Sequence, residues 1–119
     1  MIEYTVKVNE FGAKRWYLNG KLHRENGPAV EWENGEKEWY LNGNKHREEG
    51  PALEGINGNR EWWLNGDLHR EDGPAVEYSD GSKSWWLNGE LFSEKQHKKA
   101  TRKNKEYTVS ELTKVSCDE

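Results

Sequence analysis

Trp39-Tyr40-Leu41-Asn42-Gly43 is one copy of a five-residue pattern, W-x-L-N-G, that returns every 23 residues along this chain. A second pattern, H-R-E-x-G-P-A, follows the first three copies at the same spacing. A fixed period of about 20–50 residues is typical of repeat proteins, in which each unit packs mainly against its neighbours. The repeat therefore predicts an elongated array with an extended face rather than a fold built around one catalytic pocket. The copies of the first pattern lie at residues 16–20, 39–43, 62–66 and 85–89.

Each unit carries the signals of a β-hairpin. In residues 28–50, the runs 29–32 and 38–41 are rich in strand-forming residues and alternate in character. Between them stands Asn34-Gly35, whose glycine tolerates the positive φ of a tight turn. The equivalent turns in the next two units are Asn57-Gly58 and Asp80-Gly81.

These signals predict an all-β fold: a single-layer antiparallel sheet of tandem 23-residue β-hairpin repeats, with about four repeats in residues 1–92. Two strands per repeat give about eight strands, because we interpret residues 43–50 as an irregular return loop. In the first repeat, a second short hairpin after Asn19-Gly20 is the alternative. We expect no helix in residues 1–92, since glycine and Asn-Gly pairs interrupt the chain too often.

The remaining residues, 93–119, form a basic C-terminal segment. The eleven residues from Lys95 to Lys105 contain six Lys or Arg and no acid, which is typical of a solvated, mobile run. Farther on, Thr108-Val109-Ser110-Glu111 has the spacing of a capping box. We therefore expect a short helix near residues 108–115 that covers one end of the sheet and protects its open edge.

Alternation along the strands divides the side chains between two faces. If the face of Val30 and Trp32 coincides with that of Trp39 and Leu41, one side is buried by a Trp and Leu ladder. The buried ladder would contain Trp16, Trp39, Trp62 and Trp85 with Leu18, Leu41, Leu64 and Leu87. The opposite face would carry Tyr17, Tyr40, Trp63 and Trp86 beside Glu31, Glu38, Glu54, Glu61 and Glu77.

Composition narrows the functional classes. Hydrophobic residues form 32% of the chain and charged residues 34%. This balance is close to that of a disordered protein, but seven Trp and five Tyr favour a thin aromatic core. Residues 1–92 carry 11 Lys and Arg against 17 Asp and Glu, a net charge of −6, which disfavours nucleic-acid binding. No apolar run reaches the length that spans a membrane, and residues 1–7 lack the apolar stretch of a signal peptide. We expect a cytoplasmic protein.

The three His-Arg-Glu triplets are the candidates for chemistry. Equivalent residues of successive hairpins lie about 9–10 Å apart, too far for a shared metal, whose nitrogen ligands lie at about 2 Å. We therefore expect no metal, no cofactor and no catalysis, and we interpret the triplets as structural. The alternative is a polar ligand row, in which forked arginine donors meet carboxylate or phosphate. That row would consist of Arg24, Arg47, Arg70, His23, His46 and His69.

The aromatic–Gly–His–Gly order of the repeat resembles that of the MORN (membrane occupation and recognition nexus) repeat and its bacterial variants. The second aromatic of each W-x-L-N-G copy, as in Tyr40, is followed by Gly43, His46 and Gly50. The Arg-Glu-x-Gly-Pro after each His is one residue longer than the usual MORN return. The chain also resembles the tandem W-Y-x-N-G-x-x-H-R-x-x-G-P-A proteins of bacteriophage and bacterial genomes. These resemblances imply an elongated antiparallel sheet with a binding or scaffolding role.

We expect a non-catalytic protein-binding module. Given the resemblance, its most concrete form is a phage-type accessory protein that inhibits a host factor or defence system. Two alternatives stay open: a sponge for a nucleotide-like signal between the Trp and Arg rows, and a DNA mimic built on the Glu rows. Self-association through the exposed face is a further alternative. The expected partner-binding residues are Tyr17, Tyr40, Trp63, Trp86, Glu38 and Glu61.

Overall fold

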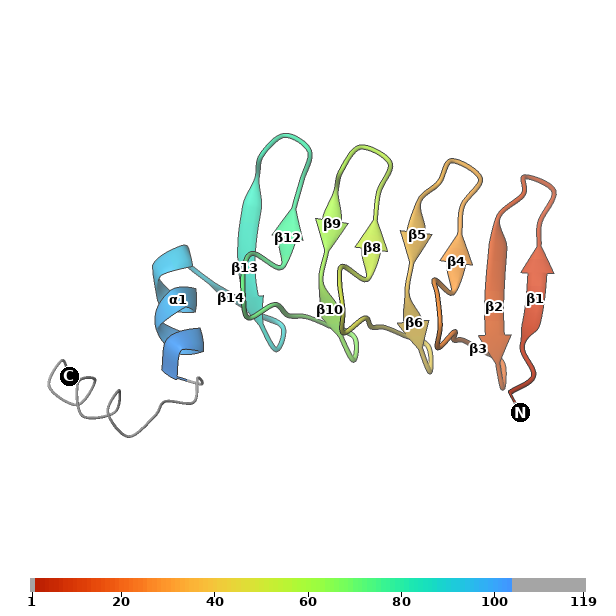
Figure 1. Ribbon diagram of the computed structural model, residues 1–119, viewed down its shortest axis with the longest axis horizontal. Helices are drawn as coiled ribbons and strands as arrows, with labels where there is room; N and C mark the ends of the chain where they lie inside the picture. The colour runs from red at the N-terminus through yellow and green to blue at the C-terminus, as the bar shows by residue number, and fades with distance from the viewer. Residues whose placement is uncertain (1, 104–119) are drawn as a thin grey trace, which may run out of the picture.

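The structure, a computed structural model that describes residues 2–103, is built from antiparallel β-hairpins set side by side, with one short helix at the C-terminal end (Figure 1). The all-β prediction is confirmed. One sheet contains ten strands in the order β1-β2-β4-β5-β8-β9-β12-β13-β14, with β3 beside β2. The longest dimension of the molecule is 62 Å and the shortest is 20 Å.

Each repeat has two hairpins, which we call upper and lower after their places in Figure 1. The described residues therefore form fourteen strands rather than about eight. The upper hairpins consist of β1 (Thr5–Val8), β2 (Lys14–Leu18), β4 (Val30–Glu31), β5 (Lys37–Glu38), β8 (Leu53–Glu54), β9 (Arg60–Glu61), β12 (Val76–Glu77) and β13 (Lys83–Leu87). The lower hairpins add β3 (Lys21–Leu22), β6 (Tyr40–Leu41), β7 (Asn44–Lys45), β10 (Trp63–Leu64), β11 (Asp67–Leu68) and β14 (Glu90–Phe92).

The lower hairpins correct the expectation of an irregular loop at residues 43–50. Asn42 has a φ of 52° and Gly43 a φ of 82°. Positive φ at both central residues is the signature of a type I′ turn. Tyr40 and Leu41 then pair with Lys45 and Asn44. The same turn recurs at every Asn-Gly of the W-x-L-N-G pattern, so the second hairpin considered for the first repeat is a feature of all four.

The upper turns contain three residues. Trp32 donates its N–H to the carbonyl of Glu36 (2.9 Å), and Gly35 donates to the carbonyl of Trp32 (3.0 Å). Gly35 has a φ of 99°, whereas Asn34 is not among the residues with positive φ. A three-residue turn with glycine in the left-handed region is a common hairpin connection.

This turn corrects the predicted assignment of the faces. A two-residue turn would set Val30 opposite Trp39, but the extra residue sets Val30 opposite Glu38 and Glu31 opposite Lys37. A shift of one residue moves every side chain of a strand to the other face. Val30 and Trp32 therefore lie with Glu38 and Tyr40, while Glu31, Glu54 and Glu77 lie with the first Trp of each repeat.

The most deeply buried residues lie in a row that alternates Trp and Ala across the sheet. Trp39 donates its N–H to the carbonyl of Ala52 (2.7 Å), and its own carbonyl accepts the N–H of His46 (3.0 Å). The strand thus changes partner at this Trp, from the upper to the lower hairpin. Extension of the strand register gives the row Trp16, Ala29, Trp39, Ala52, Trp62, Ala75 and Trp85.

The predicted burial of the Trp and Leu ladder, whose Trp residues belong to this row, is only partly correct. Ala29, Ala52 and Ala75 are completely buried, but the Trp residues of the row are half-buried. The core of a single-layer sheet is therefore made of small residues that Trp side chains flank. Val30, Val76 and Leu87 complete it, with Ala13 at the N-terminal turn.

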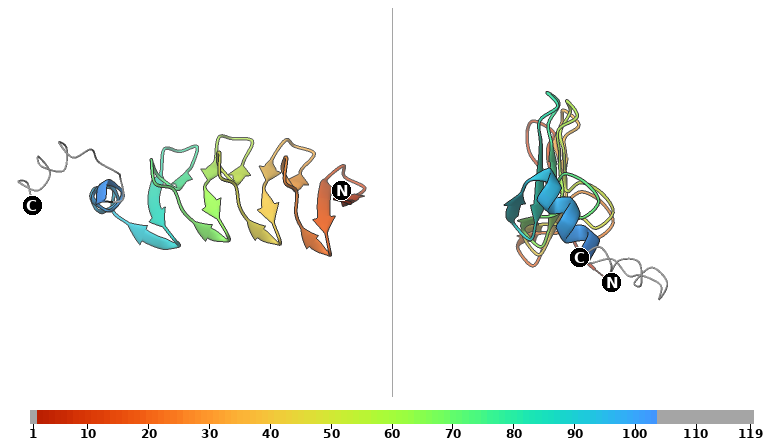
Figure 2. Two further views of the ribbon diagram at one scale, coloured as in Figure 1. Left: turned by 60° about the horizontal axis from the view of Figure 1, so that its bottom comes forward. Right: turned by 90° about the vertical axis from the view of Figure 1, so that its left-hand side faces the viewer.

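Helix α1 (Glu94–Lys103) begins one residue before the predicted solvated run, includes most of it, and lies beyond β13 and β14 at one end of the array (Figures 1 and 2). Ser93 and Gln96 form a capping box. Ser93 Oγ accepts the N–H of Gln96, and Gln96 Oε1 accepts that of Ser93 (both 3.1 Å). His97 is buried, and its Nε2 donates to the carbonyl of Arg70 at 2.6 Å. The helix predicted near residues 108–115 lies outside the described residues.

The upper turns give a direct test of the hairpin geometry. Gly58 has a φ of 88°, and an added Cβ would meet nothing within 4 Å, so only backbone strain opposes a substitution. We expect Gly58→Val to lower the free energy of unfolding by at least about 1 kcal/mol. Asn57→Val is the control, because Asn57 does not have a positive φ. Equal stability of Gly58→Val and wild type in urea melts would contradict the turn.

Candidate interaction surface

The expected partner-binding residues come together on one side of the sheet, which we call the aromatic–acidic face. It contains Tyr17, Tyr40, Trp63 and Trp86, with Trp32, Tyr78, Glu38 and Glu61. Glu38 accepts hydrogen bonds from the Tyr40 hydroxyl and from Trp32 Nε1 (both 2.8 Å). Glu61 accepts from Trp63 Nε1 at 2.9 Å. Each carboxylate thus fixes the orientation of an aromatic ring.

The last repeat has a serine in place of the glutamate of the two preceding repeats. Ser84 stands where the earlier repeats have Glu38 and Glu61, and its Oγ accepts from Trp86 Nε1 at 2.8 Å. The negative charge of the face is therefore confined to its middle. Burial, and then the hydrogen bond to Glu38, raise the pKa of the Tyr40 phenol, so this hydroxyl stays a donor throughout the physiological range.

Cations of the chain itself already lie over several rings of this face. Lys7 lies 4.8 Å from the Tyr17 ring centroid, Arg15 lies 4.9 Å from that of Trp32, and Lys45 lies 5.0 Å from that of Trp63. Lys45 takes the position that Leu occupies in the other repeats and reaches the next repeat. These contacts show that the rings of this face accept cationic groups, because cations are attracted to the electron-rich face of an aromatic ring.

Sequence reasoning missed three exposed members of the face. Trp32 is 36% exposed and Tyr78 is 47% exposed, and both stand at the upper turns. Leu91, opposite Trp86, is 63% exposed. The signal was in the sequence, since Trp32, Gly55 and Tyr78 are equivalent positions, but their face could not be assigned without the turn length.

The opposite side, which we call the arginine face, is internally paired. Each arginine of the H-R-E pattern stacks on the first Trp of its own repeat: Arg24 on Trp16 (3.9 Å), Arg47 on Trp39 (3.9 Å) and Arg70 on Trp62 (3.8 Å). The same guanidinium groups donate to the carbonyls of Pro28, Pro51 and Pro74 and to Glu31, Glu54 and Glu77. Each arginine therefore joins its return loop to the sheet.

The histidines join successive repeats. His46 Nδ1 accepts the backbone N–H of Asn65, which opens the Asn-Gly turn of the next repeat, at 2.9 Å. His23 and His69 make the same contact one repeat earlier and one later. An imidazole that accepts at Nδ1 carries its proton at Nε2 when neutral. For His46, Nε2 lies 3.7 Å from Glu48. These contacts support a structural role for the triplets.

Charges on the arginine face alternate from strand to strand. The Cα partners across the sheet run Lys14, Glu31, Lys37, Glu54, Arg60, Glu77 and Lys83. Opposite charges on directly facing residues stabilise a strand pair. Every acid of this ladder lies between two basic residues and also bonds an arginine of the H-R-E pattern. The row of acids is therefore neutralised.

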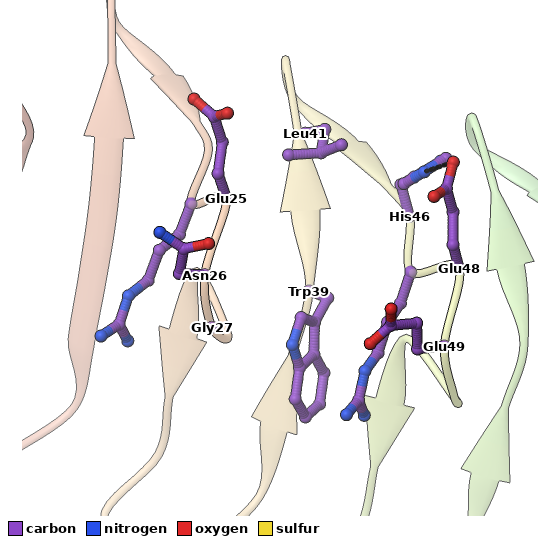
Figure 3. Close-up of a pocket in the computed structure, with 10 residues that line it drawn as sticks. Glu25, Asn26, Gly27, Trp39, Leu41, His46, Glu48 and Glu49 are labelled. Carbon is purple, nitrogen blue, oxygen red and sulfur yellow. Dashed lines mark ion pairs between the residues drawn. The ribbon is translucent and has the colours of Figure 1, made fainter. Parts of the chain in front are cut away.

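A groove of about 670 Å³ lies on this face between two return loops (Figure 3). One wall is the segment from Arg24 to Gly27 and the other contains His46 and Arg47, with Trp39 and Leu41 on the strand between them. The Trp39 ring in this groove already carries Arg47 at 3.9 Å. The arginine therefore engages its own repeat rather than an open ligand site.

No model of a protein family, no curated protein and no solved structure gives a significant match to this chain. Within residues 2–103, no group of three or more His, Cys, Asp or Glu side chains could hold a metal ion. Likewise, no helix in that part of the chain is long and apolar enough to cross a membrane.

Proposed function

We propose that this chain is a non-catalytic module that binds another protein through its aromatic–acidic face. The observation that carries the proposal is the difference between the two faces. On the arginine face, rings, arginines and acids satisfy one another, and the return loops lie there. On the aromatic–acidic face, Tyr78 and Leu91 are 47% and 63% exposed, and Trp32, which donates to Glu38, is 36% exposed even with Arg15 over its ring.

The composition of this face suits a protein partner. Aromatic residues are enriched among the positions that contribute most to binding free energy, while charges around them set partner choice and association rate. Hydrogen bonds to Glu38 and Glu61 hold two of the rings, Tyr40 and Trp63, in fixed orientations. Ordered rings lose less conformational entropy when they bind. Self-association would use the same face.

The two alternative functions receive less support. A DNA mimic needs a regularly spaced acidic row, but Glu31, Glu54 and Glu77 pair with arginines. A nucleotide sponge between the Trp and Arg rows needs open rings, whereas these arginines already stack on the Trp side chains. The narrower proposal of a phage-type inhibitor of a host factor or defence system rests on the sequence resemblance to the tandem W-Y-x-N-G-x-x-H-R-x-x-G-P-A proteins of bacteriophage and bacterial genomes.

The test of the proposal uses two aromatic residues whose removal leaves the arginine face intact. A partner is first captured on the immobilised chain from a bacterial lysate, purified, and titrated against the wild type. We expect the double variant Trp63→Ala with Trp86→Ala to bind it at least tenfold more weakly, because truncation of buried aromatic anchors costs about 2 kcal/mol or more each.

Ile56→Ala is the matched control. Ile56 is 55% exposed and lines a groove beside Trp62, on the other side of the sheet. It should leave partner binding unchanged. Thermal melts must show that the double variant is folded. Undiminished binding by a folded double variant would show that the partner binds at the return loops or at α1 instead.

A further inference from the structure

A second, larger groove of about 850 Å³ lies between the third return loop and α1. One wall is formed by the loop from Glu71 to Pro74, and the other by α1. Trp85 and Lys83 of β13 also line it. Its volume falls within the range of about 300–1,000 Å³ that is usual for small-molecule sites.

This groove is the C-terminal counterpart of the groove in Figure 3, with one difference that concerns the aromatic ring. Trp85 corresponds to Trp39, but Phe92-Ser93-Glu94 stands where the other repeats have His-Arg-Glu. No arginine of that pattern therefore stacks on Trp85. Instead, Ser93 caps α1, and the helix takes the place of a fourth return loop.

The substitution of a helix for a loop also reverses the charge of one wall. In the groove of Figure 3, that wall contains Glu48 and Glu49. In the C-terminal groove, α1 lines it with Lys95, Lys98, Lys99 and Arg102. These four residues recur three and four positions apart, which is the spacing of one helix face.

Each acid that lines this groove already has a partner within the chain. Glu71 lies 3.4 Å from His69, Asp72 pairs with Arg70 at 3.1 Å, and Glu94 pairs with Lys98 at 3.5 Å. Among the residues that the structure describes, Lys95 and Lys99 of α1 have no acidic partner within 4.0 Å. The groove thus combines an indole side chain with ammonium groups available to an anion.

We propose that this groove binds a nucleotide, with the base against Trp85 and the phosphates beside Lys95 and Lys99. An indole offers a stacking surface to any base. Lysine ammonium groups attract phosphate as point charges. The site lies on the side of the sheet away from Trp63 and Trp86, so it is separate from the proposed protein-binding face.

The experiment is calorimetric titration of the whole chain with adenosine diphosphate, adenosine and inorganic pyrophosphate at low salt. We expect adenosine diphosphate to bind at least tenfold more tightly than either of the other two, because only it carries both base and phosphates. Its affinity should fall as salt increases. Binding of pyrophosphate as tight as that of the nucleotide, or no nucleotide binding at millimolar concentration, would overturn the proposal.

Two double variants test whether nucleotide binding requires the lysines of this groove or only positive charge anywhere on the chain. Lys95→Gln with Lys99→Gln should weaken nucleotide binding at least tenfold. Lys7→Gln with Lys21→Gln removes two charges at the other end of the sheet and should leave it unchanged. An equal loss in both double variants would overturn the site. The groove variant should still bind the protein partner normally, so failure of either proposal can be recognised separately.

Discussion

Replacement of Trp62 by alanine should lower the free energy of unfolding by about 3–5 kcal/mol, the range for loss of a large aromatic from a packed site. The ring lies between Ala52 and Ala75 in the Trp–Ala row, and Arg70 stacks on it at 3.8 Å. Its removal uncovers both alanines. It also takes away the surface that supports the Arg70 bonds to Pro74 and Glu77.

Trp63→Ala is the matched control, because it removes the same side chain one position away on the opposite face. It loses the hydrogen bond to Glu61 and the contact with Lys45, but it leaves the Trp–Ala row complete. Its effect on the urea midpoint should therefore be clearly smaller. A larger loss from Trp63→Ala than from Trp62→Ala would show that the aromatic–acidic face carries most of the packing.

The fold could be predicted from sequence because its signals are local. Asn-Gly and Asp-Gly pairs mark turns through the positive φ that glycine tolerates, and alternation marks strands. The length of each turn was not encoded so plainly. Asn34-Gly35 and Asn42-Gly43 look alike, yet the first lies in a three-residue turn and the second in a two-residue turn. That single residue determines which side chains share a face.

The candidate site was predicted in part for the same reason. Tyr40 with Glu38 and Trp63 with Glu61 are two residues apart on one strand, so alternation placed them together whatever the register. The faces on which Glu31 and Trp32 lie depend on the register with the neighbouring strand. The face predicted for each of these two residues is wrong. The link from His46 to Asn65 spans 19 residues and joins two repeats, beyond the reach of local patterns.

The helix shows a third limit. Charge alone predicts a solvated run from Lys95 to Lys105, although Ser93 and Gln96 supply a capping box at its start. What the run lacks is an apolar stripe. The helix is instead anchored by a polar contact, from buried His97 to the carbonyl of Arg70. A helix held by such a contact leaves no hydrophobic period for sequence reasoning to detect.

Ala52→Leu should lower the free energy of unfolding by about 2–3 kcal/mol, even though leucine is the more hydrophobic residue. Ala52 is completely buried, and the register sets it directly between Trp39 and Trp62. Its backbone is held on both sides, since its carbonyl accepts from Trp39 and its N–H donates to the carbonyl of Glu61. A larger side chain must therefore displace one of the Trp rings and the arginine stacked on it.

The neighbouring position provides the control for this overpacking. Leu53 lies on the aromatic–acidic face, where the equivalent residues of the adjacent repeats are Val30 and Val76. Leu53→Val should therefore cost only about 1 kcal/mol, the usual effect of one lost methylene. If Ala52→Leu melted at or above the wild-type temperature, the Trp–Ala row would have room to spare. Packing between the Trp side chains would then not require a residue as small as alanine at these positions.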